Sequence, residues 1–121
     1  LLDNTSYMSD LSPLNDEEYQ LIHQAVNIIN STITVPCTGC AYCVDGCPMN
    51  IAIPKYFSLY NADLQEVEEK GWTPQGEYYA NLTKTFGKAS DCIACGQCVG
   101  VCPQHLPIIE YLQDVAQHFE K

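Results

Sequence analysis

Apolar residues recur at helical spacing in several stretches of the chain. The first stretch places its apolar residues on one helix face: Tyr19, Ile22, Ala25, Val26 and Ile29. This pattern predicts a helix from about residue 16 to about residue 30. Asn15 is placed to cap its start, and Glu18, three residues later, completes a capping box.

Prolines open the other predicted helices. Pro54 is placed as a first helical residue, and Phe57 and Tyr60 follow on one face. Thr73 and Pro74 form an N-cap and N1 pair.

The helix that Thr73 and Pro74 open carries an apolar stripe of Tyr78, Leu82 and Phe86, and Gly87 is placed to cap its end. Leu106 and Pro107 open a last helix. Its apolar residues are Ile108, Tyr111, Leu112, Val115 and Phe119.

The remaining stretches carry no sign of a sheet. Residues 1–13 are polar and predict an irregular segment. No segment alternates between apolar and polar residues as a strand would, and no hairpin signal joins such segments. The sequence therefore predicts a mostly α fold.

Length and charge exclude several classes of function. The 121 residues suit one domain and are too few for a complete TIM barrel, which needs about 250. Lys and Arg total 5 against 15 Asp and Glu, and none of the five is Arg, so the net charge is −10. This balance disfavours binding to nucleic acid or to an anionic membrane.

No stretch of the chain is apolar enough to span a bilayer, and we expect no signal peptide. The chain begins with Leu-Leu-Asp rather than Met. We therefore expect a piece of a longer, cytoplasmic polypeptide.

Eight cysteines form two matching blocks. The first block is Cys37-Thr-Gly-Cys40-Ala-Tyr-Cys43-Val-Asp-Gly-Cys47-Pro48. The second block is Cys92-Ile-Ala-Cys95-Gly-Gln-Cys98-Val-Gly-Val-Cys102-Pro103. The four cysteines, a valine and the proline match, and an aliphatic-Pro step that starts a helix follows each block. This repeat suggests a pseudo-two-fold arrangement.

The spacing C-x2-C-x2-C-x3-C-P is typical of proteins with two 4Fe–4S clusters. Three closely spaced thiolates bind three irons of one cubane, and the fourth cysteine ligates the other cluster. The predicted ligands of cluster A are therefore Cys37, Cys40, Cys43 and Cys102. Those of cluster B are Cys92, Cys95, Cys98 and Cys47.

Small residues among the cysteines let backbone N–H groups approach the cluster sulfurs, which raises the reduction potential. They are Gly39, Ala41, Gly46, Ala94, Gly96 and Gly100.

Three other uses of these cysteines are less favoured. Structural zinc usually takes two separated C-x-x-C pairs, whereas each block here crowds three cysteines into seven residues. A disulfide scaffold is expected in small secreted chains. Thioredoxin-like chemistry uses a single C-x-x-C motif on an α/β fold.

Two cubanes with four thiolates each would take the net charge from −10 to about −14. We therefore expect a redox partner that presents a basic docking patch.

The cysteine blocks and their flanks, residues 36–61 and 89–108, resemble the C-terminal ferredoxin-like region of iron–sulfur aldo/keto reductase-family proteins. The resemblance extends over residues 12–120. It implies that a reductase barrel precedes this domain in the same polypeptide. Residues 1–32 would then be a lead-in segment and helix of the barrel's C-terminal extension, and residues 33–121 the dicluster domain.

The link of 44 residues between Cys47 and Cys92 resembles that of the α-helical ferredoxin fold of respiratory and pyrimidine-reducing enzymes. The family's catalytic residues belong to the barrel, so we expect no catalytic residue here.

Electron transfer within a larger oxidoreductase is the leading hypothesis, because a purely structural role usually needs only one cluster. The alternative is a structural or protein-interaction module, whose clusters staple the fold without redox turnover. A redox sensor ranks lower, because the sequence has no DNA-binding element to report the signal.

Overall fold

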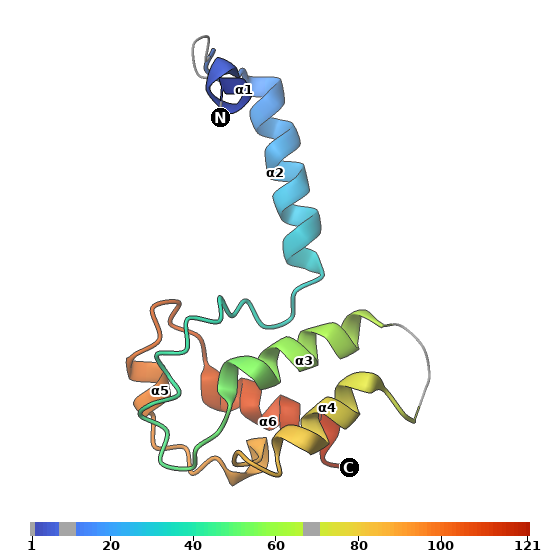
Figure 1. The fold of residues 1–121 in the computed structure, drawn as a ribbon, viewed down its shortest axis with the longest axis vertical. Coiled ribbons are helices and arrows are strands. Elements are labelled where there is room, and N and C mark those ends of the chain that lie inside the picture. Colours follow the sequence, from blue (N-terminus) through green and yellow to red (C-terminus); the bar gives the residue numbers. More distant parts are fainter. Residues whose placement is uncertain (1, 8–11, 67–70) are drawn as a thin grey trace. The chain divides into compact units, whose positions relative to one another are not determined.

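The computed structural model describes residues 2–7, 12–66 and 71–121. The chain divides into two units, Leu1–Thr32 and Ile33–Lys121. Both units consist of helices joined by turns and loops (Figure 1). Within the described ranges there is no strand, only a single parallel bridge between Ile51 and Gly87. The prediction of a mostly α fold is confirmed.

The first unit contains helix α2 (Asp16–Ser31), and its start and length match the prediction. The Asn15 side chain accepts a hydrogen bond of 3.0 Å from the backbone amide of Glu18. The Glu18 carboxylate accepts one of 2.8 Å from the backbone amide of Asn15. The predicted capping box is therefore present. It satisfies backbone donors that the first turn of a helix leaves without partners.

A short helix, α1 (Leu2–Ser6), lies before α2 in the sequence. The prediction of an irregular segment over residues 1–13 is wrong at these positions. The Thr5 hydroxyl donates to the carbonyl of Leu2 at 3.0 Å, and the Ser6 hydroxyl donates to that of Asp3 at 2.7 Å. These hydroxyl groups donate to carbonyls three residues earlier, so the polar side chains are accommodated within a helical turn.

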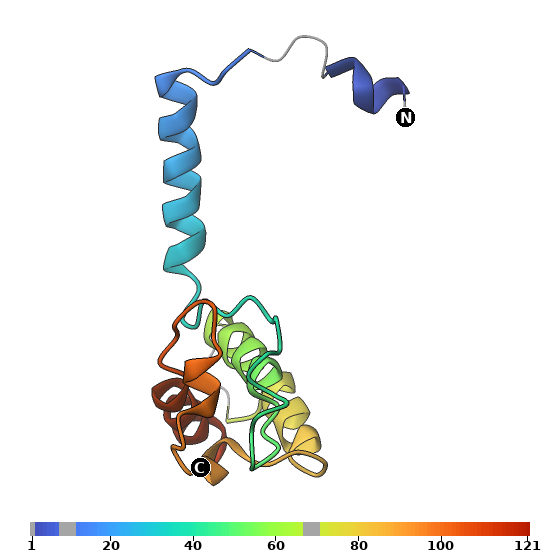
Figure 2. The same cartoon turned by 90° about the vertical axis from the view of Figure 1, so that its left-hand side faces the viewer.

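The second unit contains α3 (Ile53–Gln65), α4 (Pro74–Leu82), the 3₁₀ helix η2 (Ala89–Asp91), α5 (Gln97–Gly100) and α6 (Ile108–Phe119). Helix α3 packs against both α4 and α6, and η2 and α5 pack against α6 (Figures 1 and 2). The first cysteine block lies in the loop that precedes α3, and the second block, which includes α5, precedes α6.

The core of the second unit lies where these helices meet. Its largest fully buried side chains are Tyr56, Phe57, Ile51, Ile53, Ile108, Leu112, Val35 and Val115. Each such apolar side chain contributes about 1.5–3 kcal/mol through burial. Tyr79 stacks on Phe119 with ring centroids 4.9 Å apart and meets Tyr56 at 4.7 Å.

Helix α4 begins as predicted and ends earlier than predicted. The Thr73 side chain caps its start by accepting a 3.1 Å hydrogen bond from the amide of Gly76. Thr83 occupies the C-cap, so the prediction that Gly87 ends this helix is wrong. Gly87 instead lies against residues 49–51. A Cβ atom there would fall 2.2 Å from the carbonyl oxygen of Met49. Its role is close backbone approach, which only glycine permits.

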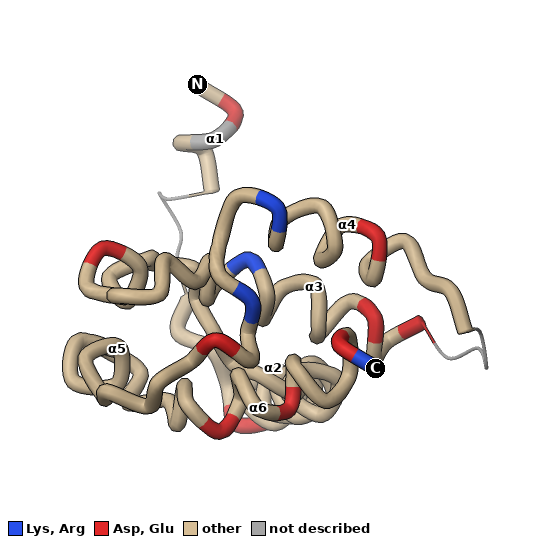
Figure 3. Tube along the Cα trace, turned by 90° about the horizontal axis from the view of Figure 1, so that it is seen from below, with Lys and Arg blue, Asp and Glu red and all other residues tan. Residues whose placement is uncertain are grey.

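Most charges lie on the surface of this unit, but the Asp63 side chain is only 7% exposed. No polar or charged residue is buried as a whole among the residues that the structure describes. Acidic residues lie along α3, α4 and α6, and lysines are few (Figure 3). The His118 Nε2 atom contacts the carboxylate of Asp63, which joins the end of α6 to α3. No helix in the described part of the chain is long and apolar enough to cross a bilayer.

Candidate metal centres

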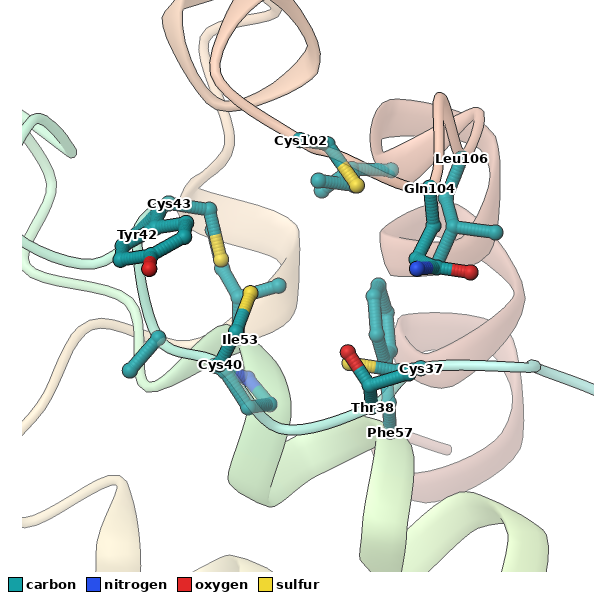
Figure 4. A pocket seen from close by; sticks show the side chains of 13 residues that line it. Cys37, Thr38, Cys40, Tyr42, Cys43, Ile53, Phe57, Cys102, Gln104 and Leu106 are labelled. Carbon is teal, nitrogen blue, oxygen red and sulfur yellow. The ribbon is translucent and has the colours of Figure 1, made fainter.

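The eight cysteines line two pockets in the second unit. The first pocket is lined by Cys37, Cys40, Cys43 and Cys102 (Figure 4). The second pocket is lined by Cys47, Cys92, Cys95 and Cys98. Each pocket therefore brings together three cysteines of one block and the fourth cysteine of the other.

Both pockets have apolar walls. Phe57, Leu106 and Ile108 line the first pocket, and Ile51 and Leu112 line the second. The space free of protein atoms is about 340 Å³ in the first pocket and about 320 Å³ in the second, part of it open to solvent. Ile53, the first residue of α3, lines both pockets. A single buried side chain thus borders the two sites.

Exposure of the cysteines follows the repeat. The third cysteine of each block, Cys43 or Cys98, is buried, and the second, Cys40 or Cys95, is exposed. The first and fourth cysteines of both blocks are half-buried. Each pocket therefore has a buried inner sulfur and an exposed outer one.

The backbone also repeats between the two blocks. Residues with left-handed φ angles occur at matching positions: Gly39 (70°) with Ala94 (54°), Ala41 (66°) with Gly96 (78°), and Asn50 (51°) with His105 (52°). Alanine rarely adopts this conformation, which costs about 1–2 kcal/mol relative to the right-handed region.

Four of the six small residues singled out in the sequence therefore serve the shape of the loops. Gly46 and Gly100 do not share the left-handed φ.

The inner thiols resist ionisation in the metal-free state. Burial raises the pKa of Cys43 to about 11, against a hydrogen bond from its own backbone amide. The neighbouring thiols of Cys37, Cys98 and Cys40 raise it further. Burial also raises the pKa of Cys98, although backbone hydrogen bonds from Val99 and Cys98 oppose the shift. Binding of metal as thiolate must therefore displace protons from these groups.

The donor set suits a cluster. All eight cysteines are free thiols, so no disulfide forms between them. In the described ranges, no three His, Cys, Asp or Glu side chains converge to hold a single metal ion. A cubane does not require such convergence, because its four thiolates bind four different irons. Soft sulfur donors around a largely apolar space match the ligation of iron–sulfur clusters.

The model of the 4Fe–4S dicluster domain family matches residues 36–106. The chain belongs to this family. The match covers both cysteine blocks and the helices between them. Searches of curated proteins and of solved structures found no match. The eight cysteines of this dicluster domain fit two 4Fe–4S clusters, and the cofactor prediction is confirmed.

Two side-chain clamps at the block entrances were not anticipated from the sequence. Each clamp holds the residue two positions before the first cysteine of a block. In the first clamp, the Asn61 amide accepts from the Val35 N–H and donates to the Val35 carbonyl, both at 2.8 Å. In the second clamp, Glu120 accepts from the Ser90 N–H at 3.1 Å and from the Ser90 hydroxyl at 2.5 Å. Nothing in the local sequence signals these pairs, because the partners are 26 and 30 residues apart.

Proposed function

We propose that the dicluster domain transfers electrons through its two 4Fe–4S clusters as a module of a larger oxidoreductase. Cluster A is bound by the four cysteines of the first pocket, Cys37, Cys40, Cys43 and Cys102. Cluster B is bound by the four of the second pocket, Cys92, Cys95, Cys98 and Cys47. The observation that carries this proposal is the sharing of cysteines between the blocks, three and one in each pocket.

The arrangement of the pockets supports a relay. Each cluster, when bound, supplies one-electron redox chemistry. The exposed cysteines Cys40 and Cys95 mark the side of each site from which an external carrier reaches it. Ile53 borders both sites, so clusters bound in the two pockets would be neighbours separated by a protein side chain.

The host and partners of the module form the finer part of the proposal. The resemblance of residues 36–61 and 89–108 to iron–sulfur aldo/keto reductase-family proteins supports a reductase barrel earlier in the same polypeptide. Catalysis would then take place in the barrel and not in this domain. The net charge of −10 supports docking of a redox partner through a basic patch. In this proposal residues 1–32 lead from the barrel, and residues 33–121 carry the clusters in a cytoplasmic protein.

A structural or interaction module is the second candidate function. It is favoured by the same shared cysteines, because metal in the two pockets would tie residues 37–47 to residues 92–102. Metal binding of this kind contributes directly to folding. The two candidates differ in whether the bound clusters accept and return electrons.

The first experiment measures iron and acid-labile sulfide in anaerobically prepared protein. It continues with EPR after dithionite reduction and with reoxidation. About eight iron and eight sulfide per chain, with reversible signals, are expected for a relay. Clusters that cannot be cycled without unfolding would overturn the relay and favour the structural module. Zinc or absence of metal in native protein would overturn both.

Paired substitutions test which cysteines share a cluster. The double variant Cys40→Ser with Cys102→Ser removes two ligands from cluster A and should leave one intact cubane. The double variant Cys40→Ser with Cys47→Ser removes one ligand from each cluster and should leave no intact cubane. If each cluster instead used the four cysteines of one block, the two results would be exchanged.

A further inference from the structure

The two cysteine blocks are held at the same point by different chemistry. The first clamp is a neutral amide, Asn61 of α3, and the second is a carboxylate, Glu120, which follows α6. Each clamp bonds the residue two positions before a first cysteine, Val35 or Ser90. Two residues span at most about 7 Å of chain. The second clamp therefore holds a negative charge close to Cys92, whereas the first clamp holds only a neutral amide close to Cys37.

The Glu120 carboxylate is fixed by several donors. Besides Ser90, it accepts a 2.5 Å hydrogen bond from the hydroxyl of Tyr79. That hydroxyl in turn accepts one of 2.9 Å from the amide of Ala89. The Tyr79 ring is packed between Tyr56 and Phe119. The charge is thus held in place by the core and by the backbone that leads to Cys92.

Glu120 is ionised at neutral pH. Partial burial opposes its ionisation, but hydrogen bonds from the Ser90 hydroxyl, the Tyr79 phenol and the Ser90 amide outweigh burial. Lys88 adds to them, and the pKa of Glu120 is lowered from its ordinary value. Lys88 itself is exposed, so water screens its effect on the cluster.

Each block also has an aspartate beside its cysteines. Asp45 lies in the first block and Asp91 adjoins the second, and both side chains are exposed. The clamps add a difference in fixed charge between the two sites.

We propose that the Glu120 carboxylate makes cluster B harder to reduce than cluster A, so that electrons run from the second pocket to the first. A fixed negative charge disfavours the addition of an electron nearby, and more strongly where solvent is partly excluded. In the transfer, one electron leaves cluster B and enters cluster A. Cluster B is oxidised by one electron and cluster A is reduced by one electron, and no atom or proton moves. This inference rests on the proposed function, since both clusters must be redox-active.

The test compares Glu120→Gln with Asp114→Asn in anaerobic holoprotein by protein-film voltammetry and EPR-monitored titration. Gln keeps the three hydrogen bonds of the second clamp, because its amide group donates to the Ser90 hydroxyl and its oxygen accepts the other two. Asp114 is an exposed carboxylate on α6, so Asp114→Asn changes the net charge equally. We expect Glu120→Gln to raise the lower of the two potentials and narrow the gap between them. Asp114→Asn should leave the gap unchanged.

Two further variants connect each potential to a pocket and test the reciprocal change. Cys40→Ser perturbs the cluster in the first pocket, and Cys95→Ser perturbs the cluster in the second pocket. The voltammetric wave that Glu120→Gln shifts should therefore be the wave that Cys95→Ser also alters. Asn61→Asp places a carboxylate in the first clamp, loses the hydrogen bond to the Val35 carbonyl but can keep the one from the Val35 amide, and should lower the other potential. The control is the rate of hydrogen exchange at the Ser90 amide. An equal rate in the wild type and in Glu120→Gln would show that the second clamp is retained.

Three outcomes overturn the inference. Equal shifts in Glu120→Gln and Asp114→Asn would make the effect one of overall charge. A shift in Glu120→Gln confined to the voltammetric wave that Cys40→Ser alters would show that the charge acts on cluster A instead of cluster B. An unchanged difference between the two potentials, with the Ser90 amide still protected from exchange, would show that the carboxylate has no effect on either potential. In each case the wild-type clusters still cycle, whereas failure of the proposed function would show as wild-type clusters that do not cycle.

Discussion

Replacing Gly87 with Ala should destabilise the domain and release iron. The added Cβ would lie 2.2 Å from the Met49 carbonyl oxygen and 3.3 Å from the Ile51 side chain. A carbon and an oxygen not bonded to each other need about 1 Å more than this, so one of the two backbones must move. At Met49 the Cβ would meet the carbonyl oxygen and, at 3.3 Å, the carbonyl carbon, which belong to the backbone and not to a flexible side chain.

The cost follows from the hydrogen bonds that the movement breaks. The Gly87 amide donates to the Asn50 carbonyl at 3.1 Å, and the Tyr56 hydroxyl donates to the Gly87 carbonyl at 2.8 Å. Each lost bond costs about 0.5–1.5 kcal/mol, and overpacking adds about 1–3 kcal/mol. A loss of about 3 kcal/mol lowers the unfolding temperature of a domain of this size by about 12–24 °C.

The same movement reaches the second pocket. Met49 lines that pocket. The backbone amide of Asn50, three residues after Cys47, donates a hydrogen bond of 3.0 Å to the carbonyl of Cys47. We therefore expect cluster B to lose iron before cluster A. Thermal unfolding by circular dichroism, together with iron and sulfide content, would measure both effects. Gly100→Ala is the matched control, because a Cβ at Gly100 meets no atom within 4 Å. A Gly87→Ala protein as stable and as iron-rich as the control would refute the close-approach argument.

Four further predictions follow from the same geometry. Burial raises the pKa of Tyr56 to about 12, so its contribution to stability is complete below pH 10 and is lost as the pH rises through 12. In an alkaline absorbance titration, Tyr56→Phe should remove an ionisation step near pH 12. Tyr79→Phe removes the acceptor of the Ala89 amide and should cost about 1–3 kcal/mol in chemical denaturation. Ala94→Gly relieves a left-handed alanine and should raise stability by up to about 1 kcal/mol, whereas Gly96→Ala should lower it. Iron chelation under anaerobic conditions should speed hydrogen exchange in the two cysteine blocks before it does so in α3 and α6.

Local signals predicted the elements whose partners are close in sequence. The capping box at Asn15 and the N-cap at Thr73 were recognisable because cap and amide lie three residues apart. The end of α4 was not recognisable, since Gly87 resembles a helix cap in sequence. Gly87 lies against the backbone of Met49, which is 38 positions earlier in the chain.

The same distinction applies to the cysteine sites. Their spacing predicts two ligand sets, because the repeat itself carries the pattern, and this assignment stays a prediction. The clamps depend on where α3 and α6 end after packing, so no local pattern could reveal Asn61 or Glu120. His118 also had no predicted partner, although it contacts Asp63 across the two helices.

The cost of the loop conformation links the clusters to the fold under either candidate function. Ala41 and Ala94 adopt left-handed φ angles, which together cost about 2–4 kcal/mol. That is a large part of the 5–15 kcal/mol that typically stabilises a domain, about as much as one or two buried side chains contribute. Bound clusters would help to offset this cost, so loss of structure on iron removal is expected of a relay and of a structural staple alike. Reversible reduction and reoxidation of the bound clusters separates the two functions, and a potential that responds to the Glu120 charge would then set the direction of the relay.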